Sequence, residues 1–71
     1  MDNRFKEGQE VFGFYFPDDS QLTIKQSNVD KITVVMEYGQ MATVPWFAVW
    51  KDGKIVSKHN GAHLAYVVIS E

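Results

Sequence analysis

Both tryptophans, both histidines and three lysines of this chain lie between residues 46 and 63. Indole rings attract cations and stack on planar groups, and lysine ammonium groups donate to carboxylates or phosphates. Aromatic and basic side chains on one sheet face are typical of platforms for single-stranded nucleic acid or nucleotides. The same tryptophans could instead fill a second core or a dimer interface, with lysine stems lying over them. The candidate partner- or ligand-binding residues are Trp46, Trp50, Lys54, Lys58 and His63.

The two histidines do not form a recognisable metal or catalytic site. His59 and His63 are four residues apart, but Asn60-Gly61 lies between them and favours a turn over a zinc-binding helix. In a hairpin their side chains would point to opposite faces. Ser57 lies close by in the sequence, but adjacency does not make a nucleophile and its base.

The adjacent carboxylates Asp18 and Asp19 could act in acid–base or metal chemistry. Beside Pro17 and Ser20, however, they are typical of a turn. The sequence also contains no glycine pattern that would cradle a phosphate. We therefore expect a non-enzymatic protein with no catalytic residues, metal or cofactor.

Length and composition exclude several classes of protein. The chain has 71 residues, 45% of them hydrophobic, no cysteine and a net charge of -2. It therefore cannot form disulfides, is too apolar for a disordered chain, and is not basic enough for tight non-specific binding to duplex DNA. No apolar run approaches the roughly 18 residues that span a bilayer. We expect one soluble, cytoplasmic domain over residues 1–71, of a size typical of phage or mobile-element accessory proteins.

The elements that must position these side chains are predicted to be strands. Val, Ile, Thr and aromatic residues supply most of the apolar bulk, which favours strands, and no segment reads as a helix. We expect five to six antiparallel strands that curl into a small SH3-like barrel or sandwich. Pro45 predicts that the segment 41–50 is an edge strand, or is bent or bulged at that residue. Period-two alternation predicts strands at 10–16, 21–26, 31–38, 41–50, 54–59 and 63–70. Their inward residues include Phe12, Phe14 and Phe16 in the first, Leu22 and Ile24 in the second, and Ile32, Val34, Met36 and Tyr38 in the third.

The segment from Lys6 to Val11 resembles the first strand of SH3-like barrels, in which a lysine-glycine step precedes an apolar strand. The resemblance covers about a tenth of the chain. It implies a barrel fold and transfers no functional residue.

Two turns set the predicted register of the last three strands. Asp52-Gly53 could close a two-residue turn, which would place Lys51 opposite Lys54, or a bulged turn, which would place Trp50 opposite Lys54. We prefer the bulged turn because it avoids pairing two like charges. Asn60-Gly61 predicts a two-residue hairpin turn, so that the last strand pairs with the one before it.

This register divides the aromatic residues between two faces. The predicted core face carries Phe47, Val49, Ile55, Leu64, Tyr66 and Val68. The opposite face carries Trp46, Trp50, Lys54, Val56, Lys58, His63 and Val67. A core of this size is too small to hold both sets, so we expect an interaction module that binds a protein partner and self-associates through the second face. The alternative is a platform for single-stranded nucleic acid or a nucleotide.

Overall fold

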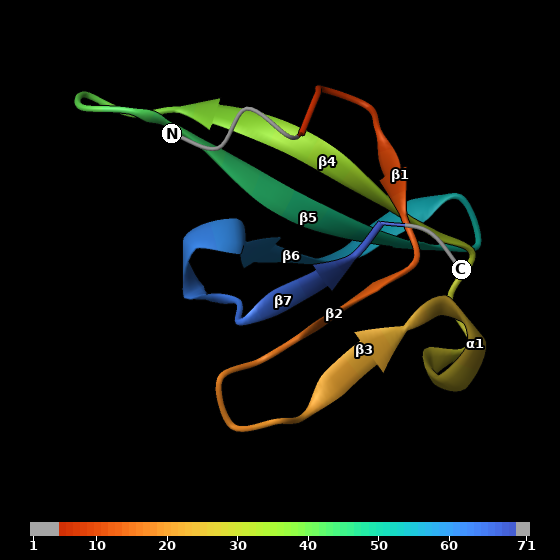
Figure 1. Ribbon diagram of the computed structural model, residues 1–71. Helices are drawn as coiled ribbons and strands as arrows, with labels where there is room; N and C mark the ends of the chain where they lie inside the picture. Colours follow the sequence, from red (N-terminus) through yellow and green to blue (C-terminus); the bar gives the residue numbers. More distant parts are fainter. Residues whose placement is uncertain (1–4, 70–71) are drawn as a thin grey trace.

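The computed structural model describes residues 5–69 and consists mainly of strands (Figure 1). Strands contain 54% of the described residues and helices contain 11%, which confirms the predicted all-β class. The strands are β1 (Glu10–Val11), β2 (Gly13–Tyr15), β3 (Gln21–Thr23), β4 (Lys31–Tyr38), β5 (Thr43–Lys51), β6 (Lys54–Asn60) and β7 (Tyr66–Val68). The helices are α1 (Ile24–Ser27) and the 3-10 helix η1 (Gly61–His63).

The strands form two antiparallel sheets. The four-stranded sheet has the order β1-β4-β5-β6, and the three-stranded sheet has the order β3-β2-β7. The two sheets are not closed into a barrel, so the SH3-like closure is not confirmed.

The predicted first strand is split by a bend at Phe12. Val11 pairs with Ile32 in the four-stranded sheet, whereas Phe14 pairs with Val67 in the three-stranded sheet. The amide of Phe12 donates to the Val68 carbonyl, which extends the pairing of β7 to the bend. One segment therefore contributes to both sheets. Phe12 at the bend is 39% exposed and Phe14 is buried, so the prediction that both lie on one inward face is wrong.

The predicted second strand ends early, at Thr23. The Thr23 hydroxyl accepts a hydrogen bond from the Gln26 amide and caps helix α1, which ends at Asn28 in the left-handed conformation. The expectation of no helix is therefore wrong for this segment. Leu22 and Ile24 nevertheless pack against the core, as predicted.

Strand β4 has the predicted bounds, but β5 is not an edge strand, since it lies between β4 and β6. Pro45 has no amide hydrogen, but β6 does not require one there, because Trp46 is the last residue of β5 that pairs with β6. On the other side, Pro45 lies opposite Met36. Gly39 donates to Ala42 at the end of this hairpin, and antiparallel alternation from there makes Pro45 part of a non-hydrogen-bonded pair. No ladder hydrogen bond therefore requires an amide hydrogen at Pro45.

The turn between β5 and β6 is the two-residue turn, and not the bulged turn that the like charges of Lys51 and Lys54 favoured. Lys51 lies opposite Lys54, and Asp52 and Gly53 both have positive φ, at 54° and 77°. Repulsion between the two lysines is relieved because the Lys51 ammonium donates to the Asn28 carbonyl at 2.6 Å. The bulged turn was therefore the wrong choice.

A bulge does occur, one step further along β6. Trp50 lies opposite Ile55 and Val49 lies opposite Ser57, which leaves Val56 as the extra residue. Ile55 is 46% exposed as a result, so its assignment to the core face is wrong.

The segment after β6 does not form the predicted hairpin. Asn60 caps helix η1 by accepting from the Ala62 amide at 2.8 Å, and the chain then crosses to the three-stranded sheet, where β7 pairs with β2. This crossing reverses part of the predicted face assignment. Tyr66 is 63% exposed, whereas Val67 packs against the core.

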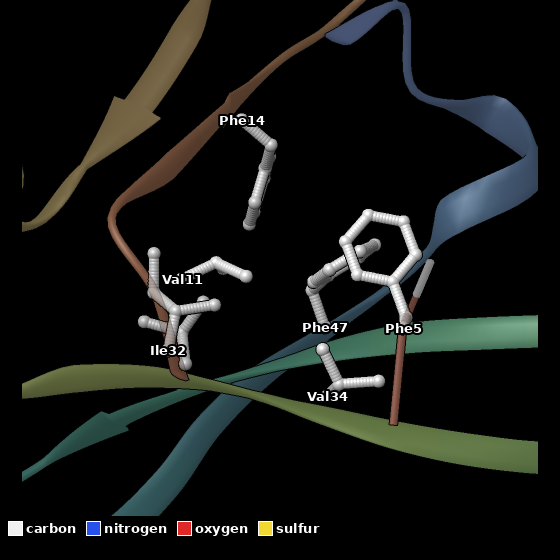
Figure 2. Close-up of a cluster of buried hydrophobic side chains, with 7 residues drawn as sticks. Phe5, Val11, Phe14, Ile32, Val34 and Phe47 are labelled. Carbon is white, nitrogen blue, oxygen red and sulfur yellow. The ribbon is translucent and has the colours of Figure 1, made fainter. Parts of the chain in front are cut away.

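The core lies between the two sheets (Figure 2). The rings of Phe5 and Phe14 lie 5.4 and 5.9 Å from the ring of Phe47. The buried cluster contains Phe5, Val11, Phe14, Ile32, Val34, Phe47 and Val49. Both sheets therefore depend on the same cluster. Within residues 5–69, no helix has the length and apolar character needed to cross a membrane.

Candidate functional site

The two tryptophans lie on the outer face of the four-stranded sheet. They alternate along β5 with core residues and flank Ala48, which has no exposed surface although it points away from the core. The Trp50 indole donates to the Thr33 hydroxyl at 2.9 Å, and the Lys31 ammonium lies 4.8 Å from the Trp50 ring. Trp50 is therefore held within a small second layer of packing, with Lys31 over its ring and its indole nitrogen bonded to Thr33.

The predicted set of five residues does not come together as a unit. Lys58 pairs with Ala48 and so shares the outer face with Trp46, and its ammonium lies 5.7 Å from the Trp46 ring. Lys54 pairs with Lys51, on the side of the sheet opposite the tryptophans. The predicted placement of Lys54 beside them is therefore wrong, and the cause is the register of the turn.

Three of the five predicted residues line one hollow at the Asn60 end of β6, which we call the β6 hollow. Its volume is about 300 Å³. Trp46 and Lys58 line it from β5 and β6, and His63 lines it from η1. Within residues 5–69, none of its lining residues is a carboxylate. They are Phe16, Trp46, Lys58, His59, Asn60, His63 and Leu64.

The charge of Lys58 is partly satisfied within the protein. Its ammonium lies 3.2 Å from a carboxylate oxygen of Glu37, and the two side chains are 41% and 48% exposed. An ion pair with this exposure contributes about 0.2–1 kcal/mol. A carboxylate from a partner could therefore replace Glu37 at little cost.

His59 was not among the predicted binding residues, although it also lines the hollow. Its ring lies 5.0 Å from Phe14 and 5.6 Å from Phe16, because His59 pairs with Phe47 and points toward the core. Burial lowers the pKa of His59, so its ring is neutral at pH 7. Only the correct register, with Phe47 opposite His59, could have revealed this placement.

Ser57 lies close to His59 but does not form a complete catalytic set. The Ser57 hydroxyl and His59 Nε2 are 3.1 Å apart. Within the described part of the chain, no carboxylate is hydrogen-bonded to His59 to orient it. Residues 5–69 also contain no group of three metal-ligating side chains.

The adjacent carboxylates serve the turn between β2 and β3. Asp18 accepts hydrogen bonds from both the amide and the hydroxyl of Ser20, and these bonds lower the pKa of Asp18. Asp19 has a φ of 73°, which Asp tolerates better than most residues. This geometry agrees with the interpretation of the pair as turn residues.

The environment of His59 predicts a pH dependence of stability. Because burial lowers the folded-state pKa of His59, the unfolded chain binds its proton more readily. The free energy of unfolding should therefore fall as the pH drops below the ordinary histidine pKa, about 6.5. Urea titrations at pH 8 and pH 5 measure this fall.

His59→Phe should reduce this fall, since phenylalanine keeps a ring against Phe14 and cannot be protonated. His63→Gln is the matched control, because it removes the exposed histidine and should keep the fall. Equal pH dependence in the wild type and in His59→Phe would show that His59 is not its source.

In comparisons with known proteins, no protein family, curated protein or solved structure matches this chain.

Proposed function

We propose that this protein is a non-enzymatic interaction module that binds an extended acidic segment of a protein partner at the β6 hollow. The observation that carries the proposal is the lining of the hollow. Lys58 supplies a positive charge, His59, Asn60 and His63 supply polar groups, and no carboxylate of the described part of the chain lines it. Trp46 and Phe16 add apolar surface for the side chains between the acidic ones.

The free edge of β6 supports an extended conformation for the bound segment. Among the described strands, β6 is the last of the four-stranded sheet and pairs only with β5. Because Phe47 and Val49 direct their backbone groups toward β6, antiparallel alternation directs those of Lys58 and Asn60 away from β5. A peptide could pair with this edge and place its acidic side chains near Lys58.

The nucleic-acid alternative is less well supported by the same geometry. Base stacking needs an accessible indole face. Lys31 lies over the Trp50 ring, Lys58 lies near the Trp46 ring, and the chain carries a net charge of -2. To bind in the β6 hollow, a protein carboxylate needs only the Lys58 ammonium group and a neighbouring hydrogen-bond donor.

Titration with a labelled peptide of alternating Glu and Val tests the proposal. Fluorescence anisotropy at low salt should show binding, and Lys58→Ala should weaken it about three- to tenfold, because one charge-assisted contact is lost. Glu37→Gln should strengthen it severalfold, since it frees Lys58 from its internal partner. Lys6→Ala is the matched control, since Lys6 is exposed and does not line the hollow.

Two results would contradict the proposal. One is the absence of binding at low salt, or equal effects of Lys58→Ala and Lys6→Ala. The other is binding of an oligothymidine that is tighter than that of the peptide and is lost in Trp46→Ala, which would support the nucleic-acid alternative.

A further inference from the structure

The hairpin that joins β4 and β5 ends in an exposed, uncharged tip, residues 38–42. Tyr38 is 85% exposed and Met41 is 96% exposed. The rest of the tip is Gly39, Gln40 and Ala42. The hairpin projects beyond the neighbouring strands (Figure 1). The β2–β3 and β5–β6 turns, in contrast, carry aspartates. An uncharged tip with two exposed large apolar side chains is typical of a contact surface.

A groove without charged residues opens beside the base of this hairpin, and we call it the apolar groove. Its volume is about 300 Å³. One wall comes from β5 and the other from η1, the following residues and β7. Although 23% of the chain is charged, no charged residue of the described part lines it. The lining includes Phe5, Pro45, Phe47, Leu64, Ala65 and Val67.

We infer that two copies of this chain associate by placing the hairpin tip of each in the apolar groove of the other. The tip and the groove match in charge, since neither carries any, so neither has to desolvate an ion when they meet. They also match in shape, because two projecting side chains meet a concave surface of a few side-chain volumes.

The position of the groove on the chain makes a closed dimer possible. Ala42 belongs to the tip and also lines the groove, so the two surfaces adjoin. Two copies related by a two-fold axis near Ala42 can exchange tips reciprocally, and both grooves are then filled. Leu64 lines both the groove and the β6 hollow, but the other residues of the hollow take no part in this arrangement, so the dimer is tested separately from acidic-peptide binding.

Sedimentation equilibrium of the intact chain tests the inference. The wild type should dimerise reversibly. Met41→Glu and Ala65→Lys should each weaken dimerisation at least about tenfold, because each buries an unpaired charge. Both positions are exposed, and circular dichroism verifies that both variants fold. Val56→Glu, which places the same charge at an exposed position outside the groove, is the matched control and should dimerise like the wild type.

Mixing the two variants gives the sharpest result. In a mixed dimer, the acidic tip of the Met41→Glu chain meets the basic groove of the Ala65→Lys chain, and the other tip and groove are unchanged. Equimolar Met41→Glu and Ala65→Lys should therefore recover dimerisation. A strictly monomeric wild type would overturn the inference. A dimer that persists unchanged in both variants, or two variants that remain monomeric when mixed, would also overturn it.

Discussion

Replacing Phe47 with alanine is expected to leave the protein largely unfolded at room temperature. Phe47 is fully buried, and its ring packs against the rings of Phe5 and Phe14. Truncation of a buried phenylalanine costs about 3–5 kcal/mol. A 71-residue chain without disulfides has little stability in reserve, so this loss removes most of it. Circular dichroism during urea titration measures the effect.

Tyr38→Ala is the matched control, since it also removes an aromatic ring. Tyr38 is 85% exposed, so at a protein concentration that keeps the chain monomeric this variant should unfold within about 0.5 kcal/mol of the wild type. If Phe47→Ala and Tyr38→Ala had the same urea midpoint, Phe47 would not be the centre of the core.

Gly61→Ala is expected to have the second largest effect on stability. A β-carbon at residue 61 would lie 2.4 Å from the Pro45 carbonyl oxygen and 2.9 Å from a ring carbon of Phe47. The first neighbour is a backbone atom of β5, so the clash cannot be relieved by a side-chain rotation. We expect a loss of about 1–3 kcal/mol, which lowers the melting temperature by about 4–8 °C per kcal/mol in a domain of this size.

Differential scanning calorimetry measures this loss, and Ala62→Ser is its control. Ala62 is the next residue in η1 and is exposed, so an added oxygen there meets solvent. A Gly61→Ala variant that melts with the wild type would show that β5 and η1 are less closely packed than described.

The sequence predicted well where local pattern and tertiary environment agree. In β4, period-two alternation lies between two turns, and Ile32 and Val34 are buried as expected. The assignment of Phe47 and Val49 to the core followed from the same alternation and is also correct. Periodicity is sufficient where the inward side chain faces the core, and it is wrong at Tyr38, which was predicted to point inward but is 85% exposed at the end of β4.

The errors lie where a distant contact overrides a local preference. Like charges at Lys51 and Lys54 argued against a two-residue turn, but the Asn28 carbonyl, distant in the sequence, holds the Lys51 ammonium. Asn60-Gly61 predicts a two-residue hairpin turn, a class of turn in which glycine commonly has positive φ. Gly61 does not have positive φ, and glycine is needed there because the Pro45 carbonyl is close. Neither contact is visible from neighbouring residues.

The candidate site was predicted by residue type better than by geometry. Trp46, Lys58 and His63 meet in the β6 hollow, although the predicted hairpin that grouped them does not form. Lys54 was misplaced by the turn register, and Trp50 is taken up by contacts with Thr33 and Lys31. The apolar groove could not be predicted, because its two walls meet only when η1 carries the chain across to the second sheet.

Because of that crossing, the two sheets also differ in how far apart their paired strands lie along the chain. β4, β5 and β6 are successive hairpins, whereas Gly13 of β2 pairs with Val68 of β7, 55 positions later. Loop-closure entropy grows with the length of the closed loop, so the three-stranded sheet carries the larger entropic cost of assembly. Non-local pairing of this kind slows folding. Because the Phe12 amide donates to the Val68 carbonyl, the bend that follows β1 in the four-stranded sheet also depends on β7 in the three-stranded sheet.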